Sequence, residues 1–258
     1  MSDTTHPDGS DRPASPPTGP AAELLAAAFA RGRLVDLTHP LVEGIPTYPT
    51  HAKYFQNNWL AFGDPARMNQ LVLGEHTGTH VDSPCHFPVA GSHAATAVDQ
   101  LPLTALVGRC AVVHTPVSEA GDVQVGVAPV LAWEQRNGRL REGDIVLFDF
   151  DWARTRWTPG PEGFAHLDRW PGLAGETAEL LRERRVKAVG TDCVSLDPGD
   201  GGDGELRAHY TLLEEGILIL ENVANLDQLP DLAYFMAFPL PIVKGTGSPV
   251  RAVAVVDG

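Results

Sequence analysis

The chain has 258 residues, of which 43% are hydrophobic, and its 19 Lys and Arg against 33 Asp and Glu give a formal net charge of −14. This length allows one large buried core, and the acidic balance argues against nucleic acid or an anionic membrane as a partner. No apolar run is long enough for a transmembrane helix, and the three cysteines form no CxxC pair, which favours a reducing, cytoplasmic location.

The first 20 residues are rich in proline and aspartate and contain no apolar stretch after the first methionine. They match neither a secretory signal nor a mitochondrial presequence, and they cannot bury enough apolar surface to offset the entropy of ordering. We therefore predict a disordered tail over residues 1–20 and a single domain over residues 21–258, because no repeat or internal linker interrupts the rest of the chain.

Along that domain, the pattern predicts a helix over residues 21–31, ended by Gly32. Short apolar, β-branched runs predict strands at 34–37, 71–73, 109–114, 144–150, 186–189, 217–223 and 250–256, and a second helix fits 173–185. Residues 54–70 are too irregular for an assignment. The mixture of strands and helices indicates an α/β or α+β protein.

Potential metal ligands are concentrated in one segment, where His76, His80, Asp82 and His86 lie within eleven residues. Imidazole and carboxylate groups are ligands of zinc and of manganese or iron(II). The alternative is a set of ordinary loop histidines beside a turn. The density of ligand-type residues favours a metal site.

Neither regular element brings this spacing to one ion. In a strand, His76 and His80 would lie roughly 13 Å apart, and in a helix Asp82 would point about 200° away from His80. A bent loop solves the problem, and Gly78 and Pro84 supply the two residues that favour a bend and stop a helix.

The segment from His76 to His86, with the sequence HTGTHVDSPCH, resembles the signature of the metal-dependent cyclase-type hydrolases. That family includes kynurenine formamidase, isatin hydrolase and related cyclic-amide hydrolases. Three other segments resemble it as well, namely VDLT at 35–38, HYTLLEEGILILEN at 209–222 and GTGSP at 245–249. The resemblance spans residues 34–256.

The resemblance implies a metal centre with two positions. His76, His80 and Asp82 would hold one ion, and Asp82 would bridge to a second ion held with His209 and Glu221. The expected metal is zinc, with manganese as the alternative, and one or two ions bind per chain.

The resemblance also implies that His86 transfers protons rather than binding the metal, a role suited to a pKa near neutrality. The fold it implies is a single α/β domain with a β-barrel-like mixed sheet core and flanking helices. The protein is expected to form a homo-oligomer, a dimer or a tetramer.

Residue-level arguments leave the second position open. Glu221 ends an apolar strand on the face of Ile219 and Val223, where a carboxylate is costly to bury unless it is paired or metal-bound. The alternative is that Glu221 is an ordinary residue at the end of a strand, exposed to solvent. By composition alone, Glu214 or Glu215 would serve equally well as a ligand.

His209 reads equally well as an ordinary histidine in the loop after the Gly- and Asp-rich turn at 197–204. The other histidines are given no role, although His51 and His93 could approach the pocket; the full set is His6, His39, His51, His93, His114 and His166.

Other catalytic arrangements fit less well. Cys85 beside His86 suggests a thiol nucleophile, but adjacent residues of an extended loop diverge, so Cys85 is expected to pack in the site wall. The GTGSP segment lacks the lysine and helix of a phosphate loop, and the turn at 197–200 provides no serine nucleophile. Aromatic residues at 54–62 and 152–170 would either line the site or pack in the core.

These features predict a hydrolase that cleaves an amide C–N bond by metal-activated water, with His86 passing a proton to the departing nitrogen. The expected substrate is a small cyclic amide or an N-formyl aryl amine such as formylkynurenine; the insertions and the tail slightly favour the cyclic amide. The alternatives are a cyclase or dehydratase of secondary metabolism, in which the metal only polarises a carbonyl, and a non-catalytic metal-binding protein.

Overall fold

The computed structural model describes residues 19–60, 63, 65–87, 90–91, 93, 95–117, 123–199 and 206–258. The predicted tail over residues 1–20 therefore falls, apart from its last two residues, outside the described part of the chain. None of the described helices is both long and apolar enough to cross a membrane.

The main element of the fold is a mixed nine-stranded sheet whose order is β1-β13-β11-β5-β7-β9-β10-β4-β12. Its strands are β1 (Gly32–Asp36), β4 (His80–Asp82), β5 (Val107–His114), β7 (Ile145–Asp149), β9 (Ala188–Thr191), β10 (Leu218–Glu221), β11 (Leu232–Met236), β12 (Gly247–Pro249) and β13 (Val253–Asp257). The four central strands, from β5 to β10, are parallel, and the strands on both sides of them are antiparallel.

Two smaller pairs and several helices complete the domain. The pairs are β2 (Phe55–Leu60) with β3 (Met68–Val72) and β6 (Gln124–Val125) with β8 (Gly172–Leu173). The helices are α1 (Pro20–Arg31), α2 (Ala128–Asn137), α3 (Ala153–Arg156), α4 (Gly175–Glu183) and α5 (Arg207–Glu214), with short 3-10 turns η1 (Pro84–His86), η2 (Val98–Gln100), η3 (Pro161–Leu167) and η4 (Leu226–Gln228).

The sheet separates two apolar clusters because successive side chains of a strand point to opposite faces. In β7, Val146 and Phe148 pack with α2, α4 and α5, whereas Ile145 and Leu147 pack on the other face of the sheet with Phe235 of β11. We call these the helix-side cluster and the opposite cluster. Burial on both faces explains why the parallel strands are continuous apolar runs in the sequence.

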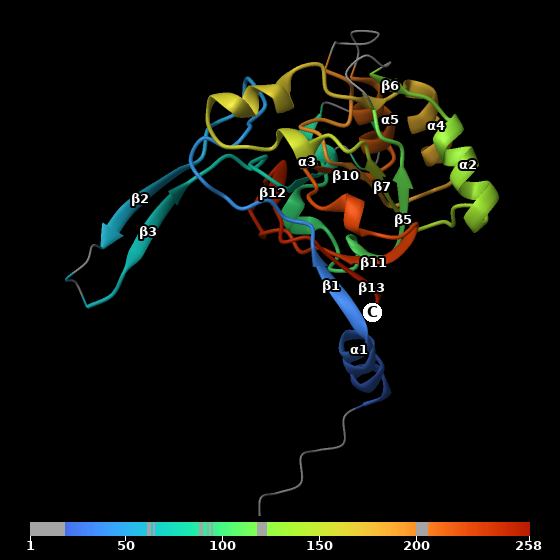
Figure 1. The fold of residues 1–258 in the computed structure, drawn as a ribbon, viewed down its shortest axis with the longest axis horizontal. Helices are drawn as coiled ribbons and strands as arrows, with labels where there is room; N and C mark the ends of the chain where they lie inside the picture. Colours follow the sequence, from blue (N-terminus) through green and yellow to red (C-terminus); the bar gives the residue numbers. More distant parts are fainter. Residues whose placement is uncertain are drawn as a thin grey trace, which may run out of the picture.

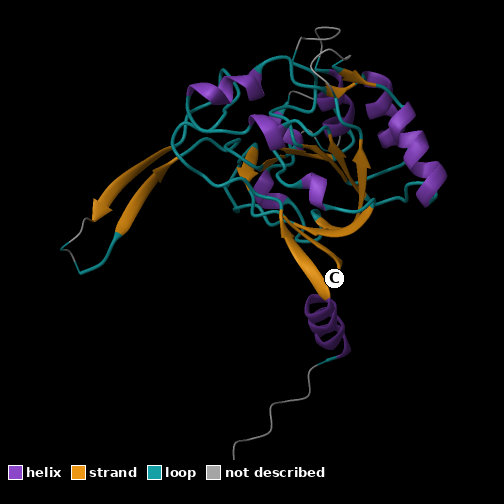
Figure 2. Ribbon diagram, in the orientation of Figure 1, coloured by secondary structure: helices purple, strands orange, loops and turns teal. Residues whose placement is uncertain are grey.

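The predicted α/β class with a curled mixed sheet and flanking helices is confirmed. The helix predicted at 21–31 is α1, the helix at 173–185 is α4, and each predicted strand overlaps an observed one. Residues 54–70, which carried no prediction, contain most of the β2–β3 hairpin, and Figure 1 and Figure 2 show that this hairpin extends away from the body of the domain.

The end of β10 differs from the sequence prediction in one detail. Ile219 faces the helix-side cluster and Glu221 lies on the same face of β10, as predicted, but Val223 packs in the opposite cluster. Asn222 has a left-handed backbone conformation (φ 53°), which ends the alternation directly after Glu221.

Candidate metal centre

The first group of donor atoms comes from the segment that the sequence singled out. His76 lies in the loop before β4, and Gly78 turns the chain with a positive φ of 65°. His80 and Asp82 then share one face of β4, while Val81 between them packs in the opposite cluster. The Nδ1 atom of His76 is 2.6 Å from Asp82 Oδ1, and His80 Nε2 is 3.4 Å from the same oxygen.

The second group joins Asp82 to two distant elements. His209 lies on α5, not in a loop, and Glu221 is the last residue of β10, directly opposite His80 in the sheet. His209 Nε2 is 3.2 Å from Glu221 Oε1 and 3.5 Å from Asp82 Oδ2. Glu214 and Glu215, the other glutamates considered, are exposed at the end of α5.

Asp82 belongs to both groups, and in each group the three ligand atoms lie within 4.8 Å of one another. The arrangement therefore places the predicted bridging carboxylate between two sets of donors. His86, which the family resemblance implied is not a ligand, belongs to neither set.

The chemistry of these donors fits a divalent cation. His80 Nε2 and Asp82 Oδ2 are buried and make no hydrogen bond. Burial opposes protonation of His80, but its contacts with Asp82 and Glu221 raise its pKa to about 10. Without a cation, protonated imidazoles would have to balance the two buried carboxylates, whereas a metal ion balances them and uses the imidazole lone pairs.

Hydrogen bonds behind the rings fix which nitrogen faces the centre. His80 Nδ1 donates to the Gly78 carbonyl at 2.8 Å, and this leaves Nε2 free to face Asp82. His76 has the opposite orientation, because its Nε2 is 3.0 Å from Thr246 Oγ1, which in turn donates to Glu75.

His209 is held by a residue that the sequence analysis assigned to a turn. Its Nδ1 is 2.5 Å from Asp197 Oδ2. Asp197 is separated from His209 by 12 positions, and no spacing rule in the sequence connects them. The GTGSP segment was singled out by resemblance, and it supplies Thr246 to the contacts behind His76.

His86 lies next to the first group. Its ring stacks on His76 with a centroid distance of 4.0 Å and an interplanar angle of 28°. Burial lowers the pKa of His86 to about 4, against the opposing effect of Asp82. The pKa is thus below the near-neutral value expected from the sequence, and the ring is neutral at pH 7.

Aromatic side chains near the centre come from residues that the sequence analysis did not select. Phe87 stacks on His209 at 4.7 Å, and Tyr48 contacts His51, whose ring is 5.4 Å from that of His76. His51 therefore does approach the site.

The aromatic residues that were selected differ in their surroundings. Tyr54, Trp152 and Trp170 are buried in the domain, and Trp59 is 63% exposed on the hairpin. Trp152 packs in the helix-side cluster, and so does Trp170, whose ring is also 6.0 Å from that of Tyr48 and so reaches the aromatic residues near the centre. Phe62 lies outside the described residues. The sequence did contain one indication that Phe87 lies near the centre, because Phe87 directly follows His86.

The remaining histidines have other partners. His93 lies against Gly216 after α5, His39 stacks on Trp157, His114 pairs with Asp149 and His166 bonds to Asn222. His6 lies outside the described residues. Cys85 is half-buried, with Sγ 3.3 Å from Ser83 Oγ, in keeping with a packing role.

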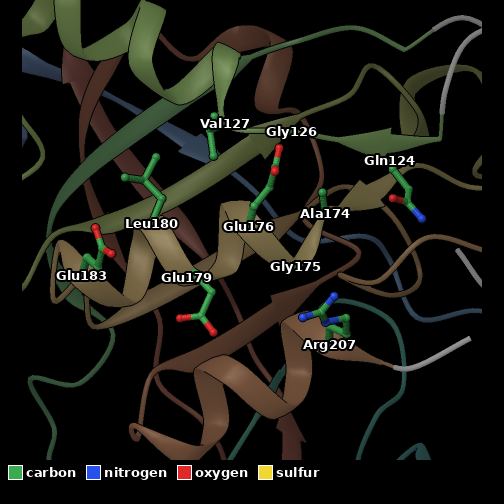
Figure 3. Close-up of a pocket in the computed structure, with 10 residues that line it drawn as sticks. All are labelled: Gln124, Gly126, Val127, Ala174, Gly175, Glu176, Glu179, Leu180, Glu183 and Arg207. Atoms are coloured by element: carbon green, nitrogen blue, oxygen red, sulfur yellow. The ribbon is translucent and has the colours of Figure 1, made fainter. Parts of the chain in front are cut away.

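A separate groove lies beside α4 (Figure 3). Glu176, Glu179 and Glu183 of α4 line it together with Arg207, the first residue of α5. None of the residues lining this groove belongs to either group of metal donors.

Comparisons with known proteins agree with this site. The Cyclase family model, described as "Putative cyclase", matches residues 35–198. The isatin hydrolase of Roseibium aggregatum is 31% identical over 83% of this chain and 80% of that protein. The kynurenine formamidase of Paracidovorax citrulli is 31% identical over 85% of this chain and 95% of that protein.

Solved structures show the same relationship. Isatin hydrolase A from Labrenzia aggregata, bound to benzyl benzoate, has a TM-score of 0.84 and 31% identity, over 92% of this chain and all of that chain. Isatin hydrolase A from Ralstonia solanacearum has a TM-score of 0.85 and 30% identity, over 95% of this chain and all of that chain. The chain therefore belongs to the cyclase family, and it is a metal-dependent amidohydrolase of that family.

Proposed function

We propose that the chain hydrolyses the C–N bond of a small aryl amide, either a cyclic amide or an N-formyl aryl amine. The observation that carries the proposal is the pair of donor groups that share Asp82, with a neutral His86 stacked on His76 beside them. The relatives named isatin hydrolase and kynurenine formamidase support the same class of bond.

The metal would be zinc, with manganese as the alternative. His76, His80 and Asp82 would hold the first ion, and His209 and Glu221 would hold the second together with Asp82. When bound, such an ion lowers the pKa of water and polarises a carbonyl group.

His86 would move the proton. Because its pKa is about 4, the ring carries a lone pair at pH 7 and can accept a proton from the attacking water. The resulting imidazolium is a stronger acid than an ordinary one, whose pKa is 6.5, so it readily donates that proton to the departing nitrogen. His86 lies beside His76 rather than among the donors, which leaves its ring free for this role.

Flat rings near the centre favour a planar substrate. Phe87 is stacked on His209, and Tyr48 contacts His51 next to His76. Stacking against such rings suits an aryl amide better than an aliphatic lactam.

A substrate panel tests this function. Metal-free protein is reconstituted with zinc or with manganese and incubated with isatin, N-formylkynurenine and an unsubstituted aliphatic lactam in ¹⁸O-labelled water. We expect metal-dependent turnover of an aryl amide with one labelled oxygen in the product, and no turnover by His80→Ala. A product without the label would instead indicate a cyclase or dehydratase, and no turnover of any amide would contradict the proposal.

We also propose that the chain acts as a homo-oligomer. A two-stranded hairpin is at best marginally stable alone in water, yet β2–β3 extends from the body (Figure 1) and exposes several apolar side chains. These are Phe55, Trp59, Met68, Leu71 and Val72, which are 46–63% exposed. Light scattering should give a multiple of the 27.6 kDa chain mass, and Trp59→Asp should shift the protein toward the monomer.

A further inference from the structure

Asp197 makes an unusual set of contacts for a residue in a turn. It lies between β9 and α5 and is 5% exposed. Its Oδ1 accepts the backbone N–H of Ala208 at 2.8 Å, and its Oδ2 accepts the backbone N–H of His209 at 3.1 Å. The same Oδ2 is 2.5 Å from His209 Nδ1. One carboxylate therefore binds both the start of α5 and the side chain of a metal-donor residue.

The backbone contacts replace a missing helix cap. The N-cap residue of α5 is Leu206, which has no side-chain oxygen, and no side-chain cap hydrogen bond is present. The first N–H groups of a helix need an acceptor, and the helix dipole favours a negative charge there. Asp197 supplies both from outside the helix.

The side-chain contact fixes the tautomer of His209. A carboxylate accepts a hydrogen bond, so Nδ1 carries the proton and Nε2 presents its lone pair to Asp82 and Glu221. The adjacent residue assists, because the Leu196 N–H donates to Glu221 Oε1 at 2.9 Å. Residues 196 and 197 thus hold both of the donors that Asp82 joins at the second position.

The first position is held differently. His80 is backed by the Gly78 carbonyl, and His76 is backed by the Thr246 hydroxyl. Among the three donor imidazoles, His209 is the one whose outer nitrogen contacts a carboxylate directly. A carboxylate behind an imidazole orients the ring and makes it a stronger donor.

We propose that Asp197 is the positioning residue of the second metal position, and that the affinity of this position, but not of the first, depends on its carboxylate. The inference rests on the metal centre of the proposed function. Loss of such an outer partner typically weakens metal binding by about 10–100-fold.

Equilibrium dialysis with zinc, followed by elemental analysis, measures the two affinities. We expect the wild type to bind two ions, and Asp197→Asn to bind the first ion as the wild type does and the second about 10–100-fold more weakly. With cobalt as a spectroscopic probe, only the absorption from the second ion should change. Asp144→Asn is the matched control, since Asp144 is a buried carboxylate that accepts the Arg141 N–H outside the metal centre.

A second variant separates the two contacts of Asp197. Leu206→Asp places an acceptor at the N-cap of α5 itself, so the double variant Leu206→Asp/Asp197→Asn keeps a capped helix without the carboxylate behind His209. It also guards against a failure of Asp197→Asn to fold. The weak second ion should persist in the double variant, and Asp197→Glu should restore part of the affinity.

Several results would overturn the inference. Asp197 would be only a helix cap if Asp197→Asn left both zinc affinities unchanged or weakened both equally. The same conclusion would follow if the double variant recovered the full affinity of the second position. A wild type that binds one ion and still hydrolyses amides would remove the second position while the proposed function stands. Two ions with no turnover of any amide would overturn the proposed function and leave the dialysis result valid.

Discussion

At the scale of single residues, His86 separates metal binding from proton transfer. Its ring is stacked on His76 but contributes no donor atom to either metal group. A positioned general acid–base typically contributes about 10²–10⁴-fold to a rate. We therefore expect His86→Ala to keep its metal content while kcat falls on that scale, as measured by elemental analysis and by turnover of the preferred amide.

His80→Ala is the matched comparison, because it removes a donor atom from the same segment. It should lose both metal and activity. If His86→Ala releases the ion as readily as His80→Ala, His86 is a ligand and the proton is carried elsewhere. Near-normal turnover in His86→Ala would mean that His86 does not transfer the proton, and His51, which lies between Tyr48 and His76, would be the next candidate.

A second residue-scale prediction concerns pH. His114 Nδ1 is 2.8 Å from Asp149 Oδ2, and its Nε2 is 3.0 Å from the Leu229 carbonyl, so both nitrogens face acceptors. The hydrogen bond to Asp149 raises the pKa of His114 above 6.5. Because the folded state favours the protonated ring, this stabilisation is complete below about pH 6.5 and is lost as the pH rises through the raised pKa.

Urea unfolding of the wild type and His114→Gln between pH 5.5 and 9 measures this effect. The difference in their free energies of unfolding should shrink as the pH rises. His39→Gln provides a comparison of opposite sign: burial lowers the pKa of His39 to about 3 in the folded state, while the unfolded ring titrates near 6.5, so the difference from the wild type should grow as the pH rises from 5.5 and then become constant. A constant difference for His114→Gln would show that its proton does not contribute to stability.

At the scale of elements, the sequence predicted what local patterns determine. The apolar runs of β5, β7, β9 and β10 were recognisable because both faces of these strands are buried. The bend at Gly78 was predictable because neither a strand nor a helix could bring His76, His80 and Asp82 to one ion. The donor sets themselves followed from a family resemblance rather than from pattern alone.

Other features depend on contacts between distant segments. The helix α5 has a Leu at its N-cap and is capped by Asp197, so its start carries no local signal. β4 has only three residues, too few for a recognisable alternation of apolar and polar side chains, and its pairing with β10 and β12 has no signal in the sequence. Phe87 contacts His209 only because the fold brings the two residues together.

The bend before β4 makes a prediction at this scale. The Gly78 carbonyl accepts hydrogen bonds from His80 Nδ1 at 2.8 Å and from Asn222 Nδ2 at 3.1 Å. Gly78→Ala strains a positive φ, which costs about 1–2 kcal/mol, and its Cβ would lie 2.8 Å from a methyl group of Leu41. Any shift of the carbonyl also turns His80, so zinc affinity at the first position should fall about 10-fold or more.

Gly143→Ala controls for the backbone strain. Gly143 also has a positive φ, of 81°, and nothing lies within 4 Å of an added Cβ. Both variants should unfold more easily than the wild type in urea, but calorimetric titration with zinc should show weaker binding only in Gly78→Ala. Equal zinc affinities in the two variants would mean that the bend does not position His80.

At the scale of the whole molecule, the metal centre joins segments that are distant in the chain. Its donors come from the loop before β4, from β4 itself, from α5 and from β10. An ion held by these donors connects residues 76–82 with residues 209–221 and so acts as a cross-link that only the folded chain can form. Folding and metal binding are therefore coupled.

This coupling makes stability depend on metal concentration. An ion that binds only the folded state stabilises it by about 4.1 kcal/mol at a free concentration 1,000 times its Kd, which for a chain of this size raises Tm on the order of 10 °C. Without the ion, Asp82 and Glu221 remain buried side by side, and protonated His80 and His209 have to balance their charges. We expect Tm, measured by differential scanning calorimetry, to rise continuously as zinc is added to chelator-treated protein.

Two variants test whether the metal centre causes this rise. Asp82→Asn should abolish most of the rise in Tm because Asp82 serves both positions, whereas Asp144→Asn should lower Tm but keep the rise. If chelator-treated and zinc-saturated wild type unfold at the same temperature, the donors do not hold an ion in the folded chain, and the cross-link is absent.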